Sequence, residues 1–411
     1  MVPTLRRPTP ALFIVLLAPF VRPVGLDYFP FIGKILTLWR LAATLYLVLA
    51  MFPLLVRPSF RMRRTGLLAL SVYWIIYLIG CIRVGTDVAS IANSAVSSLV
   101  LILLVNYEMH AGNGMTMLKG LSQLFVFYIV MHIFSVFLVK ADLLWMGFVG
   151  ESPVYLFGMD NYSAFYIYPM LAIVLYYRQL RDGAFGIAGW LLLFSVIGVY
   201  LLTKSVTAAG AGVLMLPFLF FKKQWNKLPA ILGIRLIIAA MALLLVGICF
   251  FQIQNYLASM LNSMSKGVTL NSRTYIWDHA LKLIRQRPWF GHGTFTQTQL
   301  YDEYILYGTS HAHNILLELL LYTGIAGTAA YLYYLFSFSP ILTKKPLPKA
   351  HSILLITLVG QLVLCFMDFY PTILVFYLFM QILICSHCMA EQENTVSLQQ
   401  DTQEESEEGS P

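Results

Sequence analysis

Charged residues are scarce in this 411-residue chain and make up only 11% of it. Soluble domains are roughly a quarter charged. Because 59% of the residues are hydrophobic, polar side chains are too few to cover a soluble domain, and a soluble fold is excluded. Apolar runs long enough to cross a hydrocarbon core of ~30 Å recur along the chain, whereas the short alternating segments of a transmembrane barrel do not dominate. The sequence therefore predicts membrane-spanning helices.

Cysteines and recognisable cofactor motifs are also few. The five cysteines lie mostly in apolar segments, where thiols behave as small buried hydrophobes, so we predict no disulfide framework. Cys385 and Cys388 form a C-x-x-C around His387, but a zinc site usually needs a second pair of ligands. The sequence contains no G-x-x-x-x-G-K-[ST] loop and no convincing acidic metal cluster outside the apolar segments. We predict neither a metal nor a cofactor.

The predicted fold class is all-α, a polytopic transmembrane helix bundle of about 12 spans, with one sizeable external loop that contains an amphipathic helix. The apolar pattern sets the approximate bounds. The predicted spans are 11–21, 35–56, 66–84, 89–106, 121–139, 162–178, 185–203, 206–221, 230–252, 313–337, 352–369 and 371–389.

The distribution of charge predicts the topology. The seven acidic residues after Ala390 leave 27 basic against 12 acidic residues in the rest of the chain, and the basic residues cluster in short loops between the spans. Cytoplasmic loops carry such an excess of Lys and Arg, so both termini are predicted to be cytoplasmic. The predicted regions are N-terminal transmembrane helices (1–251, about nine spans), an external catalytic loop (252–312), C-terminal transmembrane helices (313–389, about three spans) and an acidic, disordered tail (390–411).

The external loop contains a predicted amphipathic helix that starts after Asn271 and Ser272, either of which is a credible N-cap. Its apolar residues recur at helical spacing, so we expect the helix to lie along the membrane surface or over the bundle. Arg273 would stand at the N-terminal end, where the helix dipole disfavours a cation. A diphosphate shared between the guanidinium and the helix end explains this placement, and a partner carboxylate is the structural alternative.

A histidine pair in the sequence Ser-His-Ala-His-Asn, at 310–314, closes the same loop. At ~100° per residue, Gly324 shares the angular position of His313 on a continuous helix, and Gly327 lies about 40° away. This face would let another helix approach closely. A lone interfacial histidine is usually structural, but a pair at the end of an external loop favours proton abstraction from a hydroxyl group, by either His311 or His313.

Three further charges lie in or near the outer halves of predicted spans, where burial is costly unless the charge is paired or functional. These are Lys204, Glu318 and Asp368. Lys204 and Asp368 both fall at the outer ends of spans. A structural ion pair between them and an anion-binding role for the lysine are equally compatible with the sequence.

Three ordered motifs resemble the O-antigen ligase and Wzy-type O-antigen polymerase superfamily. Its members are integral membrane glycosyltransferases that use undecaprenyl-diphosphate-linked glycans. The motifs are Ser272-Arg273 followed by Trp277; Pro288-Trp289-Phe290-Gly291-His292-Gly293; and His313-Asn314, nine residues, then Gly324-Ile325-Ala326-Gly327. One departure is at 203–206, where Thr-Lys-Ser-Val replaces a motif that usually carries an arginine.

The resemblance implies a metal-independent transfer without a cofactor. His313 would act as general base on the acceptor hydroxyl, and Arg273 would stabilise the departing undecaprenyl diphosphate as a catalytic and diphosphate-binding residue. Lys204 would add a second diphosphate-binding charge, although lysine lacks the planar grip of arginine. The possible supporting residues are His311, Asn314, Glu318 and Asp368, and the helix-packing residues are Gly324 and Gly327.

The resemblance also implies partners and a location. The donor would be an undecaprenyl-diphosphate-linked glycan, and the acceptor either a lipid-linked repeat unit or a lipid-A core sugar, which leaves ligase and polymerase both open. Membrane lipid and other polysaccharide-export proteins are further expected partners, and nucleic acid is not. The expected site is the outer face of a bacterial inner or plasma membrane. The alternative from another class is a transporter or flippase of lipid-linked sugars, but the unusual polar residues gather on one external face rather than at mid-membrane.

Overall fold

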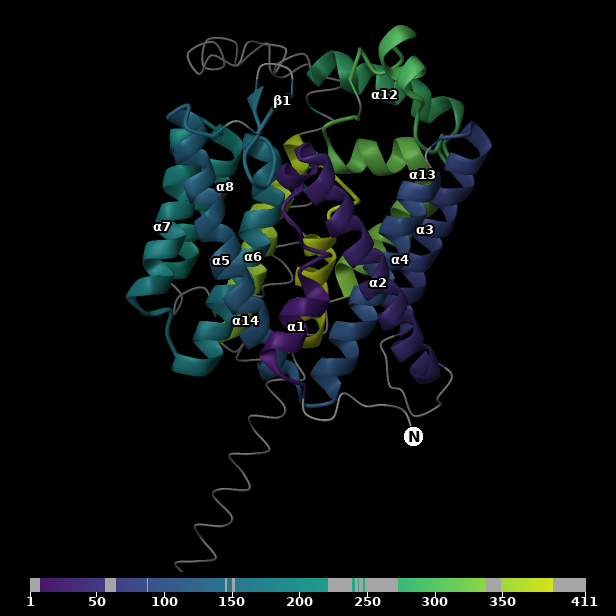
Figure 1. Cartoon of the computed structure of the whole chain (residues 1–411). Helices are drawn as coiled ribbons and strands as arrows, with labels where there is room; N and C mark the ends of the chain where they lie inside the picture. The colour runs from purple at the N-terminus through teal and green to yellow at the C-terminus, as the bar shows by residue number, and fades with distance from the viewer. Residues whose placement is uncertain are drawn as a thin grey trace, which may run out of the picture.

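A computed structural model describes most of the chain as a helical bundle (Figure 1). The described residues are 8–55, 64–86, 88–144, 146–149, 152–220, 239, 240, 243, 247, 273–309, 311–337 and 349–386. Most of the predicted span at 230–252 lies outside the described residues. The predicted N-cap residues Asn271 and Ser272 and the predicted acidic tail lie entirely outside them.

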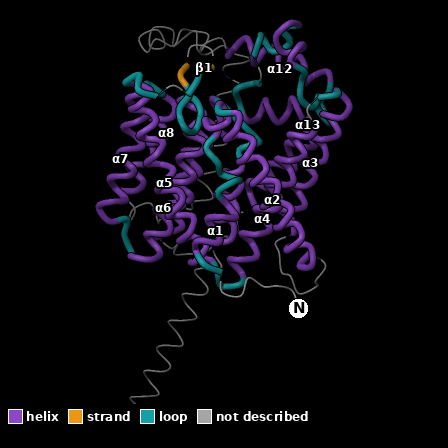
Figure 2. Tube along the Cα trace, viewed as in Figure 1, coloured by secondary structure: helices purple, strands orange, loops and turns teal. Residues whose placement is uncertain are grey.

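Helices account for nearly all of the described secondary structure (Figure 2). The α-helices are α1 (Pro10–Leu17), α2 (Pro30–Leu55), α3 (Arg64–Val84), α4 (Val88–His110), α5 (Gly114–Lys140), α6 (Asp160–Asp182), α7 (Gly186–Leu202), α8 (Val206–Phe220), α12 (Arg273–Gln286), α13 (Ile315–Leu335) and α14 (Lys349–Met367), with a final helix over Leu374–Ser386. The 3₁₀ turn η1 (Val24–Tyr28) and the π-helical turn η3 (Thr298–Asp302) join them. The two-residue strands β1 (Phe148–Val149) and β2 (Ser152–Pro153) pair antiparallel, with Phe148 opposite Pro153.

Six of the described helices are long and apolar enough to cross a membrane. They are Pro30–Phe52, Gly66–Val84, Val88–His110, Gly114–Lys140, Ile315–Leu335 and Ala350–Met367. The chain is therefore a multi-pass membrane protein with an all-helical body, and the count of about twelve spans stays a prediction. One predicted span is too short: α1 has 8 residues, about 12 Å of helix, and cannot cross alone.

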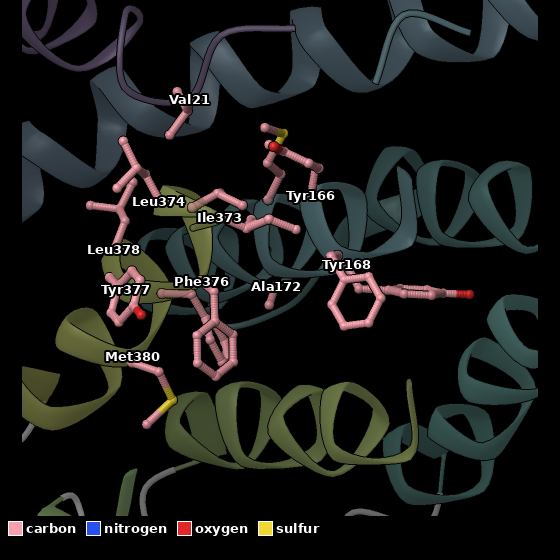
Figure 3. Packing of buried hydrophobic residues seen from close by; sticks show 14 of the residues in the cluster. Val21, Tyr166, Tyr168, Ala172, Ile373, Leu374, Phe376, Tyr377, Leu378 and Met380 are labelled. Carbon is pink, nitrogen blue, oxygen red and sulfur yellow. The ribbon is translucent and has the colours of Figure 1, made fainter. Parts of the chain in front are cut away.

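The centre of the bundle is formed by α6 and the final helix (Figure 3). Every residue from Ser163 to Tyr177 of α6 is buried, and the buried Ile373 and Phe376 lie near Tyr166 and Ala172 of α6 (Figure 3). A helix that is apolar all round is stable only when other helices or lipid surround it. These two segments are therefore the fixed frame against which the peripheral helices pack.

The peripheral helices have exposed apolar sides. On α2, large residues such as Phe31, Leu38, Leu45 and Phe52 are each more than 60% exposed. Such a surface would be a liability in water, but it matches hydrocarbon. Lipid therefore lies against α2 in the membrane.

α13 is broken at Gly324, which has φ 64° and ψ −167° inside the helix. The segments on either side run in different directions, and the first lies across the end of the bundle beneath α12 (Figure 1). The expectation of one continuous helix face that carries His313, Gly324 and Gly327 is therefore wrong. His313 precedes the helix, and the angular relation does not continue through the break.

The turn after α12 fills this break with hydrogen bonds. The amides of His292 and Gly293 donate to the carbonyls of Leu321 and Tyr322, at 2.8 and 2.9 Å. In the opposite direction, the amides of Ile325 and Ala326 donate to the carbonyls of Pro288 and Trp289, at 2.8 and 3.1 Å. Backbone groups freed by a helix break inside a membrane must find partners within the protein. The 288–293 turn supplies them.

The close approach at this break explains three glycines. A Cβ on Gly324 would lie 2.4 Å from the carbonyl carbon of Trp289, and a Cβ on Gly291 would lie 2.5 Å from the amide of Thr323. Gly293 faces Gly80 of α3, where a Cβ would come within 2.3 Å of backbone. Gly324 thus admits a turn of backbone, not a neighbouring helix as the sequence predicted. Gly327 faces the side chain of Thr323 across the break.

Candidate functional site

The histidine pair lies in a bent segment between η3 and α13. His313 has φ 51°, a left-handed conformation that non-glycine residues adopt at a cost of roughly 1–2 kcal/mol. Asn314 directly after it is the N-cap of α13, and its Oδ1 accepts from the amides of Leu316 and Leu317. The Asn314 Nδ2 donates to the carbonyl of Phe366, at 2.9 Å. Asn314 therefore fixes both the start of α13 and its position against the end of α14.

The peptide groups around Ala312 are held from two sides. The amide of Ala312 donates to Glu318 Oε2 at 2.6 Å, and its carbonyl accepts from Trp277 Nε1 at 3.0 Å. Glu318 is 4% exposed and Trp277 is fully buried. The segment that carries His311 and His313 is thus tied to both α13 and α12.

Asp368, directly after α14, joins the histidine pair. Its Oδ1 lies 3.2 Å from His313 Nδ1 in a hydrogen bond. The same oxygen accepts from the amide of Phe369 at 3.2 Å, and Oδ2 accepts from the hydroxyl of Tyr370 at 2.9 Å. Burial raises the pKa of Asp368, but the bond to His313, the charges of both histidines and the Tyr370 hydroxyl together bring it below the ordinary value. Asp368 is therefore a carboxylate at neutral pH.

An ionised Asp368 determines the tautomer of His313. A carboxylate can only accept hydrogen bonds, so Nδ1 of His313 carries the proton and donates it. In the neutral form of the ring, the Nε2 atom then has a free lone pair. The His313 side chain is 23% exposed, whereas Asp368 is 10% exposed. This is the arrangement by which a buried carboxylate orients a histidine as a base.

His311 stacks beside this pair. Its ring centroid lies 3.9 Å from that of His313 and 4.9 Å from that of Tyr370. Its Nδ1 is 3.5 Å from Asp368 Oδ1 but forms no hydrogen bond with a described residue. Burial, with smaller contributions from the positive charges of His313 and Arg273, lowers the pKa of His311 to about 4, against the opposing effect of Asp368. His311 is therefore neutral at physiological pH.

Arg273 is the first residue of α12 and acts electrostatically on His311. The first turn of α12 contains no acidic residue. The buried Nε of Arg273 has no hydrogen-bond partner among the described residues. An anion bound here could accept a hydrogen bond from this donor and interact favourably with both the guanidinium and the N-terminus of α12.

The same cluster could also hold a metal ion. Ligand atoms of His311, His313 and Asp368 all lie within 4.8 Å of one another. Two imidazoles and a carboxylate are ligands that zinc and other divalent metals accept. The geometry alone therefore permits two chemistries, a hydrogen-bonded base or a metal centre.

Lys204 forms no ion pair with the residues of this cluster. It occupies the turn between α7 and α8 with φ 57°, its side chain is exposed, and it forms no ion pair with any described residue. The ion pair between Lys204 and Asp368 that the sequence allowed is therefore not formed. The partner of Asp368 is His313.

Sequence reasoning left three site features unassigned. The sequence indicates Trp277 only as a member of the apolar stripe of its helix and of a motif, whereas its bond to Ala312 links two segments that are 35 residues apart. Tyr370 had no signal of its own beyond its place two residues after Asp368. The turn at 288–293 did carry a signal, because two glycines around His292 indicate a tight backbone approach.

Residues 162–332 of this multi-pass membrane protein match the family model described as O-antigen ligase. This segment is therefore similar to an O-antigen ligase domain, and the resemblance drawn from the motifs is confirmed. The match extends from α6 to the second segment of α13 and includes Arg273, His311 and His313, but not Asp368. No curated protein sequence matches the chain. The family supports a membrane glycosyltransferase-type function in O-antigen processing.

Proposed function

We propose that the protein transfers a glycan from an undecaprenyl-diphosphate-linked donor to an acceptor sugar hydroxyl, in the biosynthesis of a surface polysaccharide. The observation that carries this proposal is the His313–Asp368 pair beside Arg273. Asp368 leaves Nε2 of His313 free to take the proton of the acceptor hydroxyl as its oxygen bonds to the anomeric carbon of the donor. His311 lacks the bond to Asp368, so we assign the base to His313.

The leaving group is the diphosphate of the lipid carrier. As the glycosidic bond to this diphosphate breaks, negative charge develops on the phosphate oxygens. The guanidinium of Arg273 and the positive N-terminal end of the α12 dipole would stabilise that charge. Lys204, exposed at its turn, would add a point charge. Asn314, Glu318 and Trp277 position the histidine segment and touch no reacting atom.

The lipid carrier already supplies an activated leaving group, so the transfer needs no metal, and we propose that His311, His313 and Asp368 act without one. The site would face the outer side of a bacterial inner membrane, with both termini cytoplasmic. This orientation follows from the basic loops. The bend of α13 does not indicate a transport path, because the 288–293 turn already satisfies its backbone groups.

The direct test is glycan transfer by the purified protein in nanodiscs, with a defined undecaprenyl-diphosphate-linked oligosaccharide. We expect wild-type protein to lengthen the lipid-linked glycan, or to move it to added lipid-A core, equally well with and without EDTA. Arg273→Ala and His313→Ala should fail while remaining folded. Loss of transfer in EDTA with recovery on added Zn²⁺ or Mg²⁺ would instead make the cluster a metal centre. Movement of the lipid-linked sugar between leaflets without transfer, unaffected by either variant, would favour a flippase.

A further inference from the structure

A second group of charged residues, of which Arg22 and Arg40 are partly buried and Asp27 is exposed, lies outside the site described above, around the connection between α1 and α2. Arg22 lies in the loop before η1, Asp27 within η1, and Arg40 on α2. The Arg22 Nη2 donates to Asp27 Oδ2 at 3.0 Å, and the Arg22 side chain is 13% exposed. Arg22 Nη1 donates to the carbonyl of Gly33 at 3.2 Å and to Thr37 Oγ1 at 3.1 Å. Arg22 is therefore held in a fixed orientation.

Arg40 adds a positive charge that this network does not balance. It is close enough to Asp27 to lower the pKa of that carboxyl, although burial has the larger effect and raises it. Its buried Nε has no hydrogen-bond partner among the described residues, and neither has Thr44 Oγ1, one turn further along α2. One carboxylate carries a single negative charge, so the three residues together have a net positive charge. A charged side chain this deep in a spanning helix is costly unless it has a partner or a function.

The direction of Arg40 also suits a ligand at the membrane surface. Side chains of a helix lean toward its N-terminus, so Arg40 reaches back toward η1 and Arg22. In Figure 1 the N-terminal end of α2 lies at the same end of the bundle as α12. The outer side of α2 is the exposed apolar surface that faces lipid. A lipid headgroup could therefore approach the two arginines from the membrane.

A run of tyrosines connects this group to His313. The hydroxyls of Tyr162 and Tyr166, both on α6, lie 3.2 Å apart, and Tyr166 is within electrostatic range of Arg22, Asp27 and Arg40. Tyr162 packs edge-on against Tyr370 at 4.5 Å between ring centroids, and Tyr370 bonds Asp368. Side-chain contacts thus lead from Tyr166 to the histidine–aspartate pair, and Tyr166 interacts electrostatically with the arginine pair.

We propose that Arg22 and Arg40 form a second anion site, which binds a phosphate or diphosphate on the lipid that carries the acceptor. Two guanidiniums suit phosphate oxygens through paired hydrogen bonds. This inference rests on the proposed transfer reaction, in which Arg273 holds the donor. It adds that the acceptor sugar also arrives on a phosphate-bearing lipid, so that the two substrates use separate anion sites on either side of the tyrosine run.

The first measurement is binding of undecaprenyl diphosphate, without sugar, to the full chain in phosphatidylcholine nanodiscs. We expect two molecules per chain for wild type and one for Arg40→Gln, with affinity for the second reduced at least tenfold. Arg40→Lys should restore part of that affinity. Lys34→Gln removes an exposed charge from the same helix and should bind two molecules. Because Arg273 retains its own lipid in Arg40→Gln, that remaining binding event also reports that the variant is folded.

The second measurement separates this proposal from the proposed function. The same oligosaccharide is offered as acceptor on undecaprenyl diphosphate and on an alkyl chain without phosphate. Wild type should prefer the phosphate-bearing acceptor at least tenfold in kcat/KM, and Arg40→Gln should lose the preference through a raised acceptor KM. Transfer without any such preference overturns the second site but leaves the transferase standing. Two bound lipids without transfer overturn the proposed function alone.

Two further outcomes test the source of the anion. Inorganic pyrophosphate, added to nanodiscs that contain no undecaprenyl lipid, should bind at the Arg40-dependent site much more weakly than undecaprenyl diphosphate. Equal affinity would show a site for a free anion, and the lipid-borne acceptor would be wrong. Displacement of undecaprenyl diphosphate by an equal amount of phosphatidylglycerol would show a general contact with anionic lipid and would also overturn the proposal.

Discussion

Among the described turns that place a non-glycine residue in the left-handed region, the turns at His313 and Lys204 differ in what surrounds that residue. His313 has φ 51° and lies just before α13, whereas Lys204 has φ 57° and lies between α7 and α8. His313 bonds a buried carboxylate, and its neighbour Asn314 caps α13. Lys204 is exposed, and the polar side chain that is anchored at its turn is Ser205, which donates to Asn161.

The comparison shows that backbone strain alone does not mark a functional residue. At the 313 turn, the surrounding bonds fix the direction of a side chain. At the 204 turn, the bond between Ser205 and Asn161 fixes the start of α8 against α6, and the Lys204 side chain stays exposed. Strain is informative when the strained residue is also the one whose side chain is held.

The largest effect is expected from His313→Ala. Loss of a general base costs typically 10²–10⁴-fold, so we expect kcat to fall about 10³-fold in the transfer assay. Thermal unfolding and binding of undecaprenyl diphosphate should stay close to wild type. A variant that retains more than a tenth of the activity would exclude His313 as the base.

Asp368→Asn should have the next largest effect. An amide can donate to Nδ1 of His313, which favours the tautomer with the proton on Nε2 and removes the free lone pair. We expect a fall of about 10²-fold in kcat with little change in KM, measured with the same donor and acceptor. An unchanged kcat would show that the Asp368–His313 bond serves only the fold.

Gly324→Ala should destabilise the protein by about 3 kcal/mol, since a Cβ would overlap the Trp289 carbonyl carbon at 2.4 Å and the residue has positive φ. Thermal unfolding in detergent measures this loss. Gly210→Ala is the matched control, because a Cβ there meets nothing within 4 Å, and it should be neutral or slightly stabilising. Equal stability of the two variants would contradict the tight docking of the 288–293 turn.

Acid should destabilise the fold through His311. Burial lowers the pKa of His311 to about 4 in the folded chain, against about 6.5 when unfolded. Between these values the unfolded state binds the extra proton, so stability falls as pH decreases from about 6.5 to about 4, by up to about 3 kcal/mol. Thermal unfolding of wild type at pH 7 and pH 4.5, compared with His311→Gln, isolates this contribution. Parallel pH dependence in both proteins would refute it.

Lys204→Gly should have the smallest effect. The substitution removes an exposed charge, which contributes weakly to anion binding in water, and it relieves a left-handed residue. We expect less than a tenfold loss of kcat/KM and a change in unfolding free energy within about 1 kcal/mol. A loss as large as that of Arg273→Ala would show that the two turns are functionally equivalent after all.

Much of the fold follows from the sequence because apolar runs determine where helices form. Each predicted span that falls on described residues contains a helix, and Arg273 begins an amphipathic helix over the bundle, as its position predicted. The break at Gly324 could not be predicted in this way. Its neighbours Ile325 and Tyr322 continue an apolar pattern, and the break depends on backbone partners about 30 residues earlier in the chain.

The site was predictable in part for a similar reason. His313 and Arg273 belong to local motifs, so their place in the chain indicates a role. The partner of Asp368 depends on which loops meet at one end of the bundle. Charge alone favours an ion pair between Asp368 and Lys204, but the structure places His313 beside Asp368. Arg22 and Arg40 gave no motif. They stand out only once the structure shows that both interact with a single carboxylate, that of Asp27.

The turn that fills the break in α13 has a consequence for how the chain is assembled. Gly80 and Arg83 of α3 are synthesised first, then residues 288–293, and α13 last. Arg83 Nη2 donates to the carbonyl of Gly291 at 2.8 Å, so α3 can receive the turn before α13 exists. When α13 enters the membrane, acceptors and donors for its interrupted backbone are already in place. The order of synthesis therefore spares the bilayer from meeting an unpaired helix break.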